Sequence, residues 1–426
     1  MLRATFLSTG RQVAVAVFAA CLCGVPQSAQ ANDPVFEWND IARGMIVVPA
    51  FSPVQQTRAM AIVQVAIHDA VNAITKEYER YLPGGPAPAG ATAEAAAIGA
   101  GYGALKGIFG ESTPLTERYN ASITATGLTA GDPGLAFGES VAAQIVALRQ
   151  NDGSASAAHP YAAPGAGLPG VWTPISAAPA AQALLPGWGN VAPFVLHSAS
   201  QFRPEPPPAL SSDDYARDFN ELKAIGGQVS SVRTEEQRNI ALFWRASPTA
   251  LWNPILRTAI QSQDMSLSDR ARTMALFYLA ASDASVACWE AKYFYNSWRP
   301  EPAIVRGAED GNDATVADPG WRPLIPTPPH PDYISGHAAN SGAMAHVLAR
   351  VFGDEPGFVI EMTSSQNPGF VRHWQTFGEG VQEVIDARVY SGIHFRTADE
   401  VGARVGRQVA QFVLTHALKP RRPGKG

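Results

Sequence analysis

The strongest constraint on the fold is that apolar residues recur at helical spacing, while no long stretch alternates apolar and polar residues. Between residues 55 and 75, for example, Met60, Val63, Ile67 and Val71 fall on one side of a helix. Half-buried strands need a period of two, so few strands are expected. The pattern therefore predicts an all-α protein.

The same spacing, together with capping residues and helix-stopping prolines, marks out the expected helices. They cover residues 55–75, 87–108, 112–127, 134–149, 211–227, 233–245, 252–262, 266–298, 335–352, 364–390 and 396–418.

A long stretch rich in Gly, Pro, Ser and Ala, residues 151–211, separates two groups of helices. Its aromatic residues, among them Trp172 and Trp188, indicate that it packs onto the protein surface. We therefore expect an N-terminal helical half at 32–150 and a C-terminal helical half at 212–426, each a bundle, joined by this connection.

Residues 1–31 have the pattern of a secretory signal peptide. A start containing Arg3 and Arg11 is followed by a short apolar run and by Ala-Gln-Ala before Asn32, which is typical of a cleavage site. The apolar run is shorter than the roughly 20 residues that span a bilayer. The pattern predicts a secreted or periplasmic protein without a membrane span in the mature chain.

Cleavage would remove Cys21 and Cys23 and leave Cys288 alone, so neither an intramolecular disulfide nor a cysteine-based metal site is expected. The net charge of −5 would become −7 with the loss of two arginines (−5 − 2). An acidic chain argues against nucleic acid as a partner. Any anion site must therefore be a local cluster of cations.

Residues 333–337, Tyr-Ile-Ser-Gly-His, place a hydroxyl, a glycine and an imidazole directly before an apolar helical pattern. Ser335 could be an ordinary helix cap. A helix start also offers unpaired N–H groups and the positive end of the dipole, so Ser335, Gly336 and His337 could instead face an anion. The triplet alone leaves both interpretations open.

Lys292 and Arg299 are seven residues apart, so they point from one face of a helix that Pro300 ends. Their neighbours are aromatic, and no acidic residue is nearer in the sequence than Glu290. A solvated pair on an exposed face is the alternative. Two cations among aromatic rings without a counter-ion favour an anionic ligand.

Arg388 and His394 follow near the C-terminus. Their spacing of six does not place them on one helical face, and Gly392 indicates that the helix ends between them. His394 would then lie on a turn before the next helix. Taken alone, it could equally be a structural histidine.

In chain order these residues match a three-part signature, K-x6-R-P, then P-S-G-H, then S-R-x5-H-x3-D. On these residues the chain resembles the vanadium-dependent haloperoxidases and the related acid phosphatases, which form one superfamily with the type 2 phosphatidic acid phosphatases. Segments such as WNDIAR, GVWTP and LLPGWGNVAPF are similar to those of bacterial secreted haloperoxidase relatives.

Three positions depart from the signature. Ile334 replaces the proline, Ala387 replaces the serine, and Ala398 replaces the aspartate, with Asp399 one residue late. In many members a carboxylate orients the axial histidine, and Asp399 could do so only if the turn shifts. The group that orients His394 is therefore open.

The resemblance implies a vanadate site in the C-terminal bundle, with His394 as the axial vanadium ligand and His337 as the acid–base group. Lys292 would polarise the bound peroxide. A halide would then attack one peroxide oxygen and leave as hypohalous acid. The residues expected to hold the oxyanion are Lys292, Arg299, Ser335, Gly336, Arg388 and His394.

Three functions stay open at this point. The first is a haloperoxidase that acts on hydrogen peroxide and a halide or a small organic acceptor. The second is an acid phosphatase, in which the same site binds phosphate and His394 forms a phosphohistidine. The third is an oxyanion-binding protein with an impaired site. The oligomeric state is not indicated.

His330, seven residues before His337, bears on halide preference. The resemblance places it near the vanadate and the halide path, where chloroperoxidases have Phe and bromoperoxidases have His. An imidazole that hydrogen-bonds bound peroxide would reduce its polarisation, and chloride, the hardest of the three halides to oxidise, would suffer most. We expect bromide and iodide to be favoured, unless His330 is an ordinary loop residue between prolines.

Overall fold

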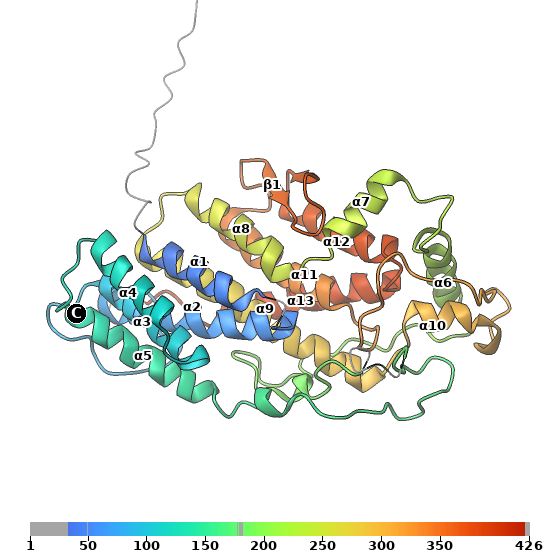
Figure 1. The fold of residues 1–426 in the computed structure, drawn as a ribbon, viewed down its shortest axis with the longest axis horizontal. Coiled ribbons are helices and arrows are strands. Elements are labelled where there is room, and N and C mark those ends of the chain that lie inside the picture. The colour runs from blue at the N-terminus through green and yellow to red at the C-terminus, as the bar shows by residue number, and fades with distance from the viewer. Residues whose placement is uncertain (1–32, 49, 177, 179–181, 422–426) are drawn as a thin grey trace, which may run out of the picture.

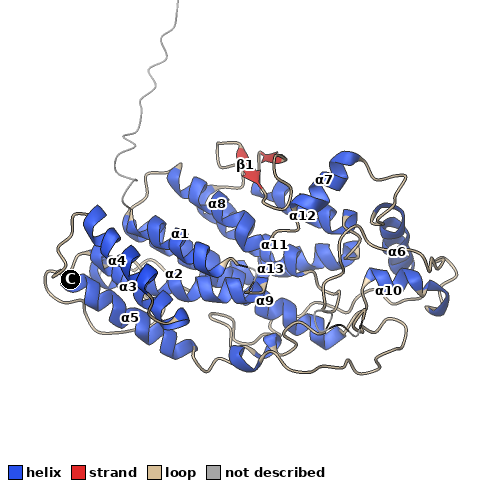
Figure 2. Cartoon of the chain, viewed as in Figure 1, coloured by secondary structure: helices blue, strands red, loops and turns tan. Residues whose placement is uncertain are grey.

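The computed structural model describes residues 33–48, 50–176, 178 and 182–421. Among these residues it confirms the all-α prediction, because helices form nearly all of the regular structure and one hairpin supplies the strands (Figures 1 and 2). The predicted signal peptide at 1–31 lies outside the described residues.

The helices and strands follow in chain order. They are α1 (Pro34–Ile46), α2 (Pro53–Thr75), α3 (Ala93–Phe109), α4 (Thr113–Ala125), α5 (Pro133–Arg149), α6 (Asp213–Ile225), α7 (Glu235–Phe243), α8 (Pro248–Gln261), α9 (Leu267–Tyr295), α10 (Pro300–Val305), α11 (Gly336–Phe352), β1 (Ile360–Thr363), β2 (Val371–Trp374), α12 (Phe377–Tyr390) and α13 (Arg396–His416).

Capping groups set where the predicted helices begin. The Ser212 side chain accepts a hydrogen bond from Tyr215 N at 3.2 Å, which starts α6 at Asp213. Ser266 and Asp269 form a reciprocal capping box at the start of α9. These local hydrogen bonds satisfy amide groups that the first helical turn leaves without a partner.

The predicted helix over 364–390 is wrong in its first part. An antiparallel hairpin lies there instead, with Ile360 of β1 opposite Trp374 of β2. The Asn-Pro-Gly sequence at 367–369 falls between the strands, and a helix cannot continue through it. The helix, α12, therefore begins only at Phe377.

Two further helices were not predicted. α1 begins after Asp33, whose carboxylate accepts hydrogen bonds from the Val35 and Phe36 amides. α10 begins at Pro300, which occupies the first helical position, where proline needs no N–H partner.

The helix predicted over 266–298 ends earlier than expected, at Tyr295, because Asn296 has a left-handed backbone conformation. Lys292 and Arg299 therefore do not share one helix. As a result, Arg299 lies at the junction between α9 and α10.

The long helix α9 passes through the centre of the molecule, with α2, α11 and α13 packed against it (Figure 1). It is buried around its whole circumference, as expected for a helix that is apolar on all sides. One hydrophobic cluster runs from Val63 of α2 through Phe277 of α9 to Met344 of α11. The division into two helical halves stays a prediction.

The connection at 151–211 is fixed to the core. Trp172 and Trp188 are 2 % and 1 % exposed. The buried Asp283 carboxylate on α9 accepts hydrogen bonds from three consecutive amides, residues 194–196, at 2.6–2.9 Å. These contacts satisfy backbone groups in a segment without regular structure, and they hold it over the side of α9.

We find no helix within the described ranges that has a stretch long and apolar enough to cross a membrane.

Candidate active site

Residues from the second and third parts of the signature line one cavity of about 290 Å³, and Arg299 of the first part contacts two of its lining residues, His330 and His394. Its wall includes His330, Gly336, His337, Arg388 and His394. The remaining predicted residues lie directly behind this wall and bond to the segments that form it, as described below.

Lys292, in the last turn of α9, is 0 % exposed. Its Nζ donates hydrogen bonds to the carbonyl oxygens of Pro331 and Asp332 at 2.6 and 2.8 Å. An ammonium group has three donors, so one stays available for a ligand. Burial lowers the pKa of Lys292 to about 7.

Arg299 joins the loops that carry the two histidines nearest to it. Its Nε donates to His330 O and its Nη1 donates to Ile393 O, both at 2.7 Å. Nη1 also lies 3.1 Å from His394 Nε2. Burial lowers the pKa of Arg299 to about 10, so the guanidinium remains charged at neutral pH.

Arg388, in the last turn of α12, is 2 % exposed and has fewer partners. Nη1 donates to Trp244 O at 2.8 Å, whereas Nε has no hydrogen-bond partner among the described residues. A buried donor without a partner is costly unless a ligand supplies the acceptor. The free Nε–H group of Arg388 therefore favours binding of an anion in this cavity.

The helix start predicted at Ser335 is confirmed. Ser335 is the N-cap of α11, and its hydroxyl accepts a long hydrogen bond of 3.4 Å from Ala338 N. Gly336 is the first residue of the helix and lines the cavity. The positive end of the α11 dipole thus lies at the same cavity as the arginines, so capping and anion binding are compatible roles.

His337 lies 3.2 Å from the Ala246 carbonyl oxygen through Nε2. A carbonyl oxygen only accepts, so Nε2 carries the proton and Nδ1 of the neutral ring is free to take one. Burial and the nearby Arg388 charge lower the pKa of His337 well below its usual value. The ring is therefore a neutral base at neutral pH.

His394 lies between α12 and α13 because the chain turns at Gly392. This residue has a φ of +78°, and a Cβ there would lie 2.2 Å from Gly226 O. Only glycine fits such a turn without strain. The predicted break at Gly392 is confirmed, and it places His394 at the cavity.

The carboxylate next to His394 is Asp332, which the sequence did not single out. Asp332 Oδ1 lies 2.7 Å from His394 Nδ1, and both side chains are only 2 % exposed. Arg299 Nη1 lies 3.1 Å from Nε2 and 3.4 Å from Nδ1 of His394, and a proton on Nδ1 would face Asp332. Burial lowers the pKa of His394 well below its usual value, which keeps the ring neutral and Nε2 available as a ligand.

The expectation of cations without carboxylates nearby is wrong. Asp332 Oδ1 is also 3.7 Å from Arg299 Nη1, and burial raises the pKa of Asp332 to about 7. Asp399 is fully buried, and burial raises its pKa well above its usual value while the charge of Arg388 opposes this shift. The signature spacing had drawn attention to Asp399 but not to Asp332, which the fold, and not the local sequence, brings to the cations.

His330 packs its ring against Trp289, with ring centroids 4.9 Å apart. Its Nδ1 lies 2.9 Å from Arg299 Nη2, which can only donate, so the ring accepts there and is neutral. Burial lowers the pKa of His330 well below its usual value. The prediction that His330 lies close to the other site residues is confirmed, whereas its effect on halide choice stays a prediction.

Comparisons with known proteins match this arrangement. The family model that describes the second helical-bundle domain of vanadium chloroperoxidase matches residues 272–422, the part that carries all three motifs. The solved structure of the first bacterial vanadium-dependent iodoperoxidase is 26 % identical, with a TM-score of 0.78 over 92 % of this chain and 98 % of that one. Both comparisons show that the chain is similar to vanadium-dependent haloperoxidases.

Two further similar proteins are more distant from this chain. The vanadium chloroperoxidase of Curvularia inaequalis is 25 % identical over 279 residues, which are 50 % of this chain and 45 % of that protein, so the chain matches about half the length of this curated relative. A holo-type bacterial vanadium-dependent chloroperoxidase shares the fold, with 19 % identity and a TM-score of 0.67 over 89 % of this chain and 97 % of that one.

Proposed function

We propose that this protein is a vanadate-dependent haloperoxidase that oxidises a halide with hydrogen peroxide. The observation that carries the proposal is the arrangement around His394. A neutral imidazole, with the Asp332 carboxylate 2.7 Å from its Nδ1, is enclosed with Lys292, Arg299 and Arg388 in one buried site. The similarity to vanadium-dependent haloperoxidases supports the same function.

The donor set fits a small tetrahedral oxyanion. Arg388 Nε lacks a partner among the described residues, and Lys292 uses only two of its three N–H donors on carbonyl oxygens. These groups, the Ser335 hydroxyl and the Gly336 N–H would hold vanadate, with His394 Nε2 as its protein ligand. Bound vanadate supplies Lewis-acid activation of peroxide without a change in its oxidation state.

The side chains around the oxyanion have separate tasks. Lys292, Arg299 and Arg388 stabilise negative charge within a site that largely excludes water. His337, with Nδ1 unprotonated, can take a proton from a hydrogen peroxide molecule that enters the cavity and can return it to a leaving oxygen. Asp332 keeps the His394 proton on Nδ1 and so keeps Nε2 in its ligand form.

The cavity volume restricts what reacts inside. About 290 Å³ accommodates an oxyanion, peroxide and a halide, but it lies below the usual range for drug-sized ligands. Larger organic acceptors would therefore meet the oxidised halogen outside this cavity. We further propose that bromide and iodide are better substrates than chloride, because the His330 imidazole lies at the same wall.

The proposal is tested by steady-state assays of protein freed of bound anions, with and without added vanadate. Peroxide-dependent oxidation of bromide or iodide that requires vanadate is expected. Phosphate-ester hydrolysis that vanadate inhibits would instead assign the acid phosphatase. Loss of both activities, with oxyanion binding retained, would assign an impaired site. His346→Ala, an exposed histidine that contacts Gln411 on the surface, is the matched control for substitutions of His394.

A further inference from the structure

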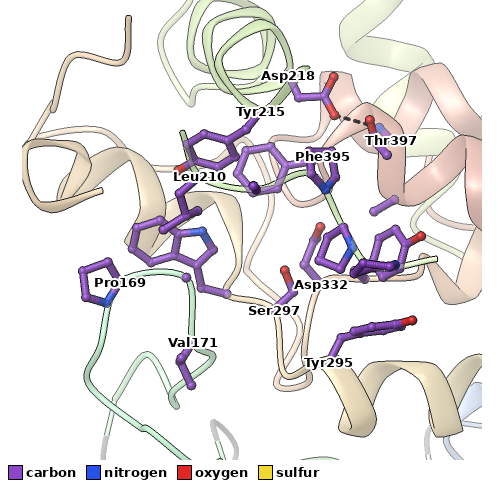
Figure 3. Close-up of a pocket in the computed structure, with 18 residues that line it drawn as sticks. Pro169, Val171, Leu210, Tyr215, Asp218, Tyr295, Ser297, Asp332, Phe395 and Thr397 are labelled. Atoms are coloured by element: carbon purple, nitrogen blue, oxygen red, sulfur yellow. Dashed lines mark hydrogen bonds between the residues drawn. The ribbon is translucent and has the colours of Figure 1, made fainter. Parts of the chain in front are cut away.

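A second cavity, of about 330 Å³, is lined by Asp332, which also contacts His394 of the site just described (Figure 3). Its walls come from the connecting segment, α6, the end of α9 and the start of α13. Five aromatic residues line it, namely Tyr215, Tyr295, Trp298, Tyr333 and Phe395. Pro169 and residues 206–208, three consecutive prolines, form part of its wall.

Two carboxylates, Asp218 and Asp332, are the only ionisable acids in this wall, and it contains no Lys, Arg or His. Asp218 is 3 % exposed. One of its oxygens, Oδ2, accepts a hydrogen bond from Thr397 N at 2.9 Å, as Figure 3 shows. The other, Oδ1, is 3.9 Å from the Nε of Arg217, a side chain that is 64 % exposed and pairs with Asp214.

The negative charge of Asp218 is thus incompletely neutralised. Burial raises the pKa of Asp218, which means that the surroundings disfavour its charged form. The amide at the start of α13 offsets part of this cost. A cation within the cavity would offset more of it, because a buried carboxylate is stable when it is paired.

We propose that this cavity binds a small organic cation, such as a quaternary or tertiary ammonium compound. Aromatic faces attract such cations through their ring electrons, and the buried Asp218 carboxylate supplies the opposite charge. The volume suits a molecule of this size, and the five rings with no competing basic residue match the apolar methyl groups around a charged nitrogen. An inorganic anion would be repelled by the Asp218 carboxylate.

The cavity is separate from the basic site that would take the oxyanion. The two share no lining residue, although Asp332 of the second cavity touches His394 of the first. The inference therefore does not depend on the proposed haloperoxidase activity. It can be tested without vanadate, peroxide or turnover.

The test uses choline and its uncharged analogue 3,3-dimethylbutan-1-ol, which has a carbon in place of the nitrogen. Calorimetry on the full chain, with sodium chloride matched throughout, should show choline binding that saturating sulfate leaves unchanged. The analogue should bind about tenfold or more weakly, because a charged contact contributes more than an apolar contact of the same shape. Equal binding of the two compounds, or no binding of choline at millimolar concentrations, would overturn the proposal.

Two substitutions on α6 locate the binding. Asp218→Asn removes the charge but keeps an acceptor for Thr397 N, and it should weaken choline binding about 10- to 100-fold. Asp214→Asn removes the same charge from an exposed position that does not line the cavity, and it should have no effect. Thermal unfolding checks that both variants are folded. Choline affinity that is unchanged in Asp218→Asn, or reduced equally in both variants, would refute the assignment.

Discussion

Replacing Asp332 with asparagine should weaken vanadate binding and leave sulfate binding no weaker. Vanadate would bond to His394 Nε2, so its affinity depends on the orientation and basicity of that ring. Sulfate needs only charges and hydrogen bonds. Removing a buried negative charge near the Arg299 guanidinium, 3.7 Å away, should favour any anion that does not bond to the imidazole.

The size of the effect follows from the contact between Asp332 and His394. The two atoms are 2.7 Å apart and each side chain is 2 % exposed, so solvent does not screen the pair. Loss of such an outer partner of a metal-binding histidine typically reduces affinity 10- to 100-fold, about 1.4–2.7 kcal/mol. Asparagine has nearly the same shape as aspartate, so a packing defect should contribute little.

Calorimetric titration with each anion provides the assay, and Asp399→Asn provides the control. Asp399 is equally buried and interacts with Ser335 and Arg388, so its substitution removes charge without releasing His394. A parallel loss of vanadate and sulfate affinity in Asp332→Asn, or the same response in both variants, would refute the reasoning. Because burial raises the pKa of Asp332 to about 7, the difference from the wild type should shrink as the pH falls below that value.

His394→Ala should abolish both vanadate-dependent halide oxidation and phosphatase turnover, and substantial turnover by the folded variant would contradict the assignment. Burial lowers the pKa of Lys292 to about 7, so the side chain is largely neutral at pH 8.5 in the free protein. Sulfate binding at this pH should therefore be accompanied by uptake of close to one proton by Lys292, and calorimetry in buffers of different ionisation enthalpy measures this uptake. This uptake should vanish in Lys292→Met; uptake that persists would argue against Lys292 as its source. His330→Phe should raise the oxidation of chloride relative to bromide, whereas His330→Gln, which keeps an acceptor for the arginine, should not; equal ratios in both variants would remove the role of His330. Gly392→Ala should lower the free energy of unfolding by roughly 1–3 kcal/mol or more in urea titrations, whereas Gly311→Ala, also at positive φ but with open space around it, should cost less.

Much of the site was predictable because short-range rules fix it. Lys292 lies in the last turn of α9, as its position in the helical pattern predicts, whereas Arg299 lies beyond the end of α9 as the N-cap of α10. Ser335 caps the next helix of the motif, and Gly392 ends the last one, each for a reason that a few neighbouring residues determine. Where neighbouring residues determine the conformation, the sequence is sufficient to predict it.

The hairpin and the partners of the cations depend on contacts that periodicity does not reveal. Apolar residues near residue 364 recur at helical spacing, but the Pro-Gly pair at 368–369 prevents a helix there. Lys292 is held by carbonyl oxygens of residues 331 and 332, which lie in a segment without regular structure. No sequence pattern predicts which backbone carbonyl oxygens accept hydrogen bonds from a buried lysine.

Asp332 supplies a carboxylate next to His394 in place of the aspartate that is missing at Ala398, although Asp332 is not part of the signature. A missing carboxylate one turn after His394 suggested an impaired site, yet a carboxylate from the loop before α11 reaches the same ring nitrogen. Because burial raises its pKa to about 7, Asp332 is partly protonated at neutral pH beside Lys292 and Arg299, and it opposes a bound oxyanion less than a fully ionised carboxylate would. A carboxyl group of this kind stabilises buried cations without permanently opposing the anion that they bind, so the changed position of the aspartate is compatible with an active site.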